Sequence, residues 1–182
     1  MRLVLASASP RRAALLRAAG YAFDVRPSGV AEWAFAGGDP AAYAEALARA
    51  KAEDGPHRPD DVVVAADTVV VVDGDVLGKP ADAVHAAAML RRLSGRSHEV
   101  VTGIVVRRGT AVGSGHDTAR VTFRPLTDAE IDAYVATAEP LDKAGAYAYQ
   151  GRAGAFVTAL AGDADTVIGL PLRLLDRLLA QL

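Results

Sequence analysis

The chain has 182 residues, of which 51% are hydrophobic and 23% charged, with a formal net charge of -2. This composition is typical of a soluble globular domain and excludes disordered and collagen-like chains, while the absence of a basic surplus argues against nucleic-acid binding. No cysteine is present, which excludes thiolate nucleophiles, disulfides and Cys-ligated metal centres. Because every apolar stretch is shorter than the roughly 18 residues of a membrane span, we expect a cytoplasmic protein.

Strand and helix patterns alternate along the chain. A small polar loop follows the first strand, Ser9 and Pro10 suit the cap and first position of the first helix, and Asp73-Gly74 indicates a hairpin turn. Strands are expected at residues 2–6, 62–72, 76–77, 98–106, 111–123 and 167–169, and helices at residues 10–19, 39–53, 82–93, 127–136 and from 171 onward. Residues 27–38 and 142–154 are expected to be irregular. This alternation predicts an α/β fold with a mixed sheet, and no linker divides residues 1–182 into independent domains.

The first candidate site is the loop that leads into the first helix. Ser7 and Ser9 precede Arg11 and Arg12, which would occupy the first turn of that helix. A helix N-terminus already has positive character, so two arginines there are unfavourable unless an anion such as a phosphate chain binds. A solvated basic turn is the alternative interpretation. The site is no P-loop, because its glycines and its Gly-Lys-Ser/Thr ending are missing.

The second candidate is Asp67, a carboxylate within the apolar strand at residues 62–72. Burying an unpaired carboxylate costs several kcal/mol, so we expect a partner, and a bound cation is a common one. Asp67 could hold Mg²⁺ or accept a proton from water. Alternatively, it satisfies backbone donors at a strand bend or lies at a sheet edge. Glu32, in the loop at residues 27–38, is a weaker candidate carboxylate.

Lysines and one glutamine complete the candidates. Of the 20 basic residues only three are lysines: Lys51 after the second helical pattern, Lys79 after the hairpin, and Lys143 before a glycine-rich segment. One interpretation is that a chain that otherwise uses arginine keeps lysine where a compact ammonium is needed. The alternative is that the low number of lysines reflects coding bias. Gln150 offers an amide that could read a base edge, although a surface-loop glutamine is the simpler interpretation.

Several strings in the chain resemble one known family. In chain order they are LASASPRR, ADTVV, GKP, LSGRSHEVVTG, EPLDKAGAY and VIGLPL. Together they resemble the Maf family of nucleoside triphosphate pyrophosphatases over nearly the whole chain. The resemblance implies an α/β fold like that of inosine triphosphate pyrophosphatases, with a mixed twisted sheet, flanking helices and two lobes around a central cleft. It also implies metal-dependent cleavage of a nucleoside triphosphate to the monophosphate and pyrophosphate.

The resemblance also implies a role for each candidate residue. Asp67 matches the proton acceptor of the family, and Lys51 and Lys79 match its charged catalytic positions. The substrate-binding positions are Ser7, Ser9, Arg11 and Arg12, and those tied to substrate choice are Arg11, Thr68 and Gln150. Asp67 and Glu32 are expected to hold a divalent cation, Mg²⁺ or Mn²⁺.

The segment around Gln150 is similar to the branch of the family that acts on dTTP and UTP. Two departures from the family pattern, Ala148-Tyr149 and Ala164, lie near the expected base pocket. The alternatives are a 7-methyl-GTP pyrophosphatase, a phosphatase that removes the terminal phosphate, and a non-catalytic nucleotide-binding regulator of cell division. The substrate is expected to be the main partner, with no nucleic acid and no membrane, and the Val-rich strands together with the resemblance suggest a homodimer.

Overall fold

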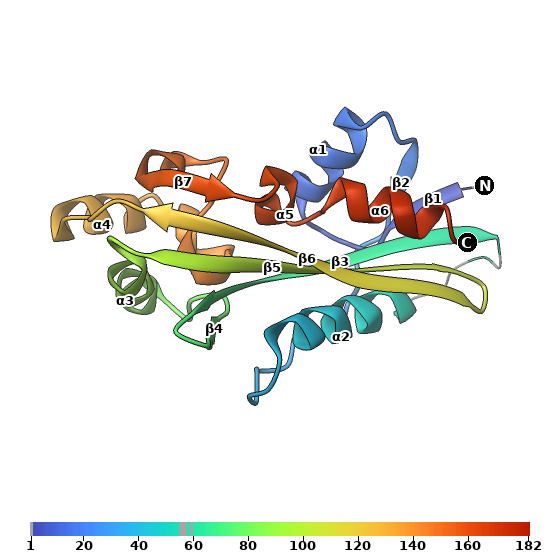
Figure 1. Ribbon diagram of the computed structural model, residues 1–182, viewed down its shortest axis with the longest axis horizontal. Helices are drawn as coiled ribbons and strands as arrows, with labels where there is room; N and C mark the ends of the chain where they lie inside the picture. The colour runs from blue at the N-terminus through green and yellow to red at the C-terminus, as the bar shows by residue number, and fades with distance from the viewer. Residues whose placement is uncertain (1, 55–57, 59) are drawn as a thin grey trace. The chain divides into compact units, whose positions relative to one another are not determined.

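The computed structural model describes residues 2–54, 58 and 60–182 (Figure 1). Its strands are β1 (Arg2–Leu5), β2 (Phe23–Val25), β3 (Asp61–Val72), β4 (Asp75–Leu77), β5 (Ser97–Arg108), β6 (Ala111–Phe123) and β7 (Val157–Ala161). The α-helices are α1 (Pro10–Ala18), α2 (Pro40–Glu53), α3 (Ala83–Leu93), α4 (Asp128–Val135), α5 (Ala164–Ile168) and α6 (Leu172–Leu179). Short 3₁₀ helices are η1 (Glu139–Asp142), η2 (Ala144–Ala146) and η3 (Arg152–Phe156).

The strands form a mixed sheet with the hydrogen-bonded order β2-β1-β3-β5-β6-β7, and β4 also pairs with β3. Strand β1 is parallel to β2 and β3, whereas β4 is antiparallel to β3 and β7 is antiparallel to β6. This sheet and its helices confirm the predicted α/β class. The β1–β3 register pairs Leu5 with Val64, so β1 ends while β3 continues to Val72.

The chain forms two compact units. The first contains the residues up to Thr68, Val101–Asp117 and Gly169–Leu182, and the second contains Val69–Val100 and Thr118–Ile168. Strands β3, β5 and β6 contribute residues to both units. A single domain over residues 1–182, with a cleft between two lobes, stays a prediction.

In the first unit, alternating strand residues face two different helical layers. Leu3, Leu5, Val62 and Val64 pack with buried residues of α1 and α6. Val4, Val63 and Ala65 instead pack with Ala48 and Ala52 of α2. The period of two along a β-strand produces this division, because successive side chains point to opposite faces. Helix α2 therefore covers one face of β1 and β3, and α1 with α6 covers the other (Figure 1).

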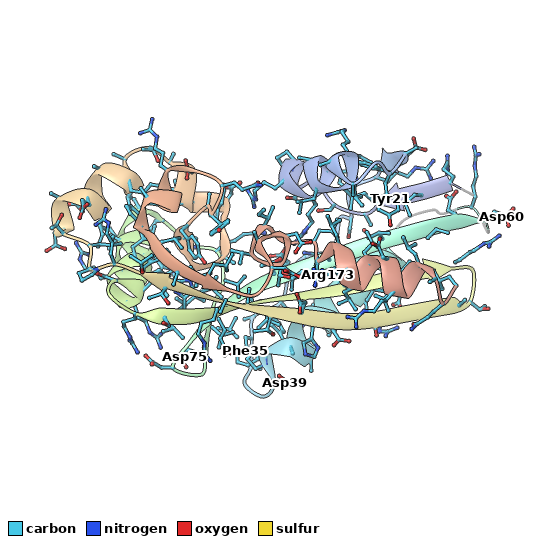
Figure 2. The ribbon with its side chains drawn as sticks, turned by 45° about the horizontal axis from the view of Figure 1, so that its top comes forward. Tyr21, Phe35, Asp39, Asp60, Asp75 and Arg173 are labelled. Atoms are coloured by element: carbon cyan, nitrogen blue, oxygen red, sulfur yellow. The ribbon has the colours of Figure 1, made fainter. Side chains whose placement is uncertain are left out.

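Close contacts hold these helices in place. Gly103 of β5 lets α2 approach, since a Cβ atom there would lie 2.5 Å from the carbonyl carbon of Ala44. On the other face, the Tyr21 hydroxyl, labelled in Figure 2, donates a hydrogen bond to Asp176 of α6. Of the residues that the structure describes, none belongs to a helix with the length and apolar character needed to span a membrane.

The second unit has an aromatic core. The ring of Phe123 makes edge-to-face contacts with His98, Tyr147 and Phe156, with centroids 5.0, 4.9 and 5.9 Å apart. The His98 Nε2 atom and the Tyr147 hydroxyl are hydrogen-bonded at 2.8 Å, and burial lowers the pKa of His98 to about 4. This core fixes the irregular segment that contains Tyr147 against β5 and β6.

The predicted cap of the first helix is confirmed, because Ser9 caps α1. Asp39 and Asp82 cap α2 and α3, and Thr127 forms a capping box with Glu130 in α4. Each side-chain oxygen accepts a bond from a backbone N–H that has no partner within the helix.

The predicted strand at residues 167–169 is wrong, because Ala164–Ile168 forms helix α5. Strands β2 and β7 were not predicted. The β-branched residues Thr166, Val167 and Ile168 are helical, so the tertiary context overrides their strand propensity.

Candidate active site

The loop between β1 and α1 is organised by serine hydroxyls. Ser9 Oγ accepts a hydrogen bond from the backbone nitrogen of Arg12 at 3.5 Å and so caps the helix. Ser7 Oγ accepts from the Ser9 nitrogen at 3.2 Å and from Arg12 Nη1 at 3.1 Å. The first turn of α1 carries no acidic residue, and Arg11 and Arg12 occupy it. The predicted basic helix start is therefore present.

Arg12 joins three distant parts of the chain. Its Nε donates to the Gly169 carbonyl at 2.7 Å, and its Nη2 donates to Thr68 Oγ1 at 3.2 Å, in addition to the bond with Ser7. Burial lowers the pKa of Arg12, and the nearby charge of Asp67 partly opposes this effect. Because these three bonds go to neutral oxygens, Arg12 holds Ser7, Thr68 and Gly169 together and also places a positive charge near Asp67. We call this set of bonds the Arg12 clamp.

Gly169 is required at this clamp for a steric reason. Its φ of +116° lies in a region that L side chains rarely adopt, and a Cβ atom would be 2.9 Å from Thr68 Oγ1. Thr68 Oγ1 also bonds Thr102 Oγ1 at 2.9 Å. Sequence analysis assigned no role to Gly169 or Thr102, although both lie in strings that carry the family resemblance.

Asp67 lies beneath helix α2 and is paired with a lysine. Its side chain is 8% exposed, that of Lys51 is 10% exposed, and the two are hydrogen-bonded. The Lys51 ammonium also donates to Glu32 Oε1 at 2.7 Å. Lys51 belongs to the last turn of α2 and does not follow that helix. The structure thus brings Asp67 and Glu32 together, as the resemblance implied, and adds Lys51 between them.

Opposing effects set the proton affinity of Asp67. Burial is the largest cause and raises its pKa, and the charge of Glu32 acts in the same direction. The charges of Lys51 and Arg12, together with the Lys51 hydrogen bond, lower it, but the net shift is upward. A carboxylate with a raised pKa is a stronger base than an ordinary aspartate, as general-base chemistry requires.

Asp67 and Thr68 face opposite sides of β3. Asp67 lies an even number of positions from Val63 and Ala65, so it faces α2 as they do. Thr68 lies an even number of positions from Val62 and Val64, which face α1 and α6. The base candidate and the Arg12 clamp therefore lie on different faces of one strand. Both lie past the C-terminal end of β1, where open α/β sheets commonly bind ligands.

The two acidic side chains can share one cation. Glu32 and Asp67 both contact the Lys51 ammonium, so their oxygens converge on one point. Carboxylate oxygens are the ligands that Mg²⁺ and Mn²⁺ prefer, and Mg²⁺ is often held by one or two carboxylates plus substrate phosphates. Within residues 2–54, 58 and 60–182, no group of three or more His, Cys, Asp or Glu side chains could hold a metal. The two carboxylates therefore supply two oxygen donors, but the Lys51 ammonium occupies the point between them, so a divalent cation there would have to displace it and take its remaining ligands from elsewhere.

An aromatic group borders the acidic cluster. The Tyr43 hydroxyl donates to the Trp33 carbonyl, and Tyr43 packs against Phe35 with centroids 5.2 Å apart. Burial raises the pKa of Tyr43, and the charges of Asp67 and Glu32 raise it further. Tyr43 was not predicted from the sequence as part of the site, although its position on α2, four residues before the buried Leu47, was an available signal.

The remaining predicted residues belong to the second unit. Lys79 is exposed and follows β4, and Gln150 is exposed in a turn between η2 and η3. Lys143 donates to the Glu139 carbonyl at 3.1 Å and pairs with Asp142. A cleft that joins Lys79 and Gln150 to Asp67 stays a prediction.

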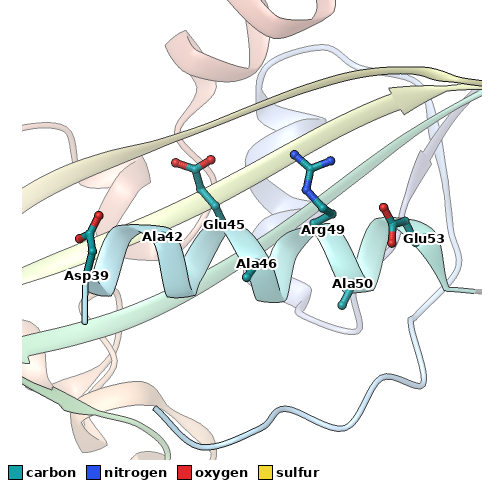
Figure 3. Close-up of a pocket in the computed structure, with 7 residues that line it drawn as sticks. All are labelled: Asp39, Ala42, Glu45, Ala46, Arg49, Ala50 and Glu53. Carbon is teal, nitrogen blue, oxygen red and sulfur yellow. The ribbon is translucent and has the colours of Figure 1, made fainter. Parts of the chain in front are cut away.

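A shallow pocket lies on the solvent-facing side of α2 (Figure 3). It is lined by Asp39, Ala42, Glu45, Ala46, Arg49, Ala50 and Glu53. Lys51 and the other buried residues of α2 are on the opposite side of the helix. None of the predicted site residues lines this pocket.

The fold and the site define an α/β protein with a buried carboxylate–lysine cluster next to a basic helix start, past the end of its first strand. Residues 2–182 match the family described as Maf-like protein, and the chain belongs to this family.

Comparison with individual proteins gives close relatives. The chain is 54% identical over 175 residues to the dTTP/UTP pyrophosphatase of Anaeromyxobacter dehalogenans strain 2CP-C, covering 94% of this chain and 89% of that protein. It is 49% identical over 180 residues to the dTTP/UTP pyrophosphatase of Symbiobacterium thermophilum, covering 98% and 93%. Among solved structures, it is similar to the nucleoside-triphosphatase, or dITP/XTP pyrophosphatase, of Mycobacterium abscessus, with a TM-score of 0.44, 18% identity and coverage of 69% and 76%.

Proposed function

We propose that this protein hydrolyses nucleoside triphosphates, dTTP and UTP foremost, to the monophosphate and pyrophosphate. Membership of the Maf family and near-full-length similarity to two dTTP/UTP pyrophosphatases support this activity. The single structural observation that carries it is the buried Asp67 held by Lys51. A protein that only bound nucleotides would have no need for a desolvated carboxylate with a raised pKa.

Asp67 is the proton acceptor in this proposal. A water molecule attacks the α-phosphorus, its proton passes to an Asp67 oxygen, and the bond to the α–β bridging oxygen breaks to release pyrophosphate. Lys51 holds Asp67 ionised before the reaction, and Arg12 contributes a second positive charge. When bound by Asp67 and Glu32, a divalent cation supplies charge neutralisation and acidifies water.

The start of α1 binds the phosphates in this proposal. Ser7 Oγ accepts two hydrogen bonds, so its own proton remains available for a phosphate oxygen. The Arg11 side chain offers a further donor, and Ser9 keeps the first helical turn in place by accepting the backbone N–H groups of Arg12 and Ala13. Lys79 neutralises the leaving pyrophosphate.

Selection of the nucleotide is assigned to Gln150, with contributions from Arg11 and Thr68. The Gln150 amide has both a donor and an acceptor, which matches the edge of uracil or thymine. A homodimer and a cytoplasmic location remain predictions of the sequence.

The test is a product assay with dTTP, UTP and 7-methyl-GTP in the presence of Mg²⁺ or Mn²⁺. We expect pyrophosphate from dTTP and UTP, and Asp67→Asn should lose turnover by a factor of about 10³ or more while retaining nucleotide binding. Asp60→Asn is the matched control, because Asp60 is exposed just before the same strand (Figure 2). Orthophosphate as the product would indicate a terminal phosphatase, and binding without product would indicate a regulator. Near-normal turnover by Asp67→Asn would contradict its role.

A further inference from the structure

Gln150 lies at the tip of a tight turn in the second unit. The Gly151 nitrogen donates to the Ala148 carbonyl at 2.9 Å, which is the closing bond of a β-turn with Tyr149 and Gln150 at its centre. Gln150 is exposed, whereas Ala148 is 6% exposed. An exposed turn presents its amide in one orientation only when both of its ends are fixed.

Two side chains fix the two ends of this turn. On the N-terminal side, the Ala148 nitrogen donates to the Tyr134 hydroxyl at 3.1 Å. That hydroxyl donates to Glu139 Oε1 at 2.9 Å, and the same oxygen accepts from the Arg152 nitrogen at 3.1 Å. An unbroken series of hydrogen bonds therefore connects the residues two positions before and two positions after Gln150.

The surroundings hold this series in place. Tyr134 is 4% exposed, and its ring contacts that of Phe156 edge-to-face with centroids 5.3 Å apart. Burial and the charge of Glu139 raise the pKa of Tyr134, so its hydroxyl keeps the proton that it donates. The Glu139 carboxylate packs directly against the turn, because a Cβ atom at Gly151 would overlap it. A side chain at Gly151 would therefore displace the Glu139 carboxylate from its present position.

We propose that Tyr134 and Glu139 are positioning residues for nucleotide selection. Neither is assigned a contact with the substrate, and both act through the backbone that orients Gln150. This inference rests on the proposed function, because it needs Gln150 to contact the base. It predicts that breaking either hydrogen bond weakens selection among bases without altering the chemistry at Asp67.

The experiment compares four variants by pyrophosphate release from dTTP and dGTP. Tyr134→Phe removes only the hydroxyl, and Glu139→Ala removes the acceptor, whereas Glu139→Gln keeps an amide oxygen that accepts both bonds. Thr127→Ala is the matched control, since it removes the cap of α4, the helix that carries Tyr134, but not a contact with the turn. Hydrogen exchange of the Ala148 and Arg152 amides is followed in parallel and does not depend on activity.

We expect the KM for dTTP to rise about tenfold in Tyr134→Phe and Glu139→Ala, with kcat within about twofold of wild type. The preference for dTTP over dGTP should fall by about the same factor. Glu139→Gln should restore most of this preference, and Thr127→Ala should leave it unchanged. Amide exchange at Ala148 and Arg152 should accelerate about tenfold or more in the two disrupting variants alone.

Two results would overturn the positioning role: an unchanged dTTP preference in both disrupting variants, or unchanged amide exchange at Ala148 and Arg152. An equal loss of dTTP preference in Thr127→Ala would overturn the positioning role as well, because general destabilisation would then explain the loss. A wild-type protein that releases no pyrophosphate from dTTP would instead contradict the proposed function. The two failures are therefore distinguishable.

Discussion

Lys51→Met tests whether the lysine is what makes a buried Asp67 tolerable. The substitution replaces the ammonium with an apolar side chain of similar length and leaves Asp67 without its hydrogen-bonded cation. The two side chains are only 10% and 8% exposed, so water replaces the lost partner poorly. Breaking a buried ion pair in this way costs about 3–5 kcal/mol. For a chain of this length, 3 kcal/mol corresponds to a decrease in Tm of about 6–12 °C.

The stability that Lys51→Met loses should depend on pH, and the direction follows from the pKa of Asp67. Burial already raises the pKa of Asp67 above its unfolded value, and removing Lys51 raises it further. Between the unfolded and folded pKa values the folded state holds an extra proton, so stability falls as the pH rises through that window. Protonation of Asp67 relieves the loss at low pH. The destabilisation should therefore be larger at about pH 8 than at about pH 5.

The assay is urea unfolding of wild type, Lys51→Met, Asp67→Asn and the double variant at both pH values. The double variant should be more stable than Lys51→Met alone, because it contains no buried charge at position 67. Equal losses at the two pH values, with additive effects of the two substitutions, would refute the reasoning.

Two glycine substitutions test the close packing around the site. Gly103→Ala should destabilise the protein by about 1–3 kcal/mol and lower kcat, because the added methyl group pushes α2 and Lys51 away from the sheet. Gly78→Ala is the control: the space around its Cβ is open, so it should change stability little in the same urea titration. Gly169→Ala should cost about 1–3 kcal/mol by strain at its φ of +116° and by displacing the Arg12 side chain; an unchanged Tm in a thermal scan would contradict this steric argument.

Local chemistry made several features predictable from sequence. Ser9, Asp39 and Thr127 mark helix starts because their oxygens satisfy backbone donors only a few residues away. The apolar run around Asp67 predicted a buried carboxylate with a partner, since burial of a lone charge is too costly. The same reasoning could not name the partner, because several cations in the chain fit the requirement equally well.

The tertiary structure alone decided which groups meet. Lys51 bonds both Asp67 and Glu32, and Arg12 reaches the carbonyl of Gly169, 157 positions further along the chain. The helix at Ala164–Ile168 likewise replaces the strand that its β-branched residues predicted. Sequence patterns report the periodicity and capping of neighbouring residues, whereas these contacts arise from the register of strands and the packing of helices that are far apart in the chain.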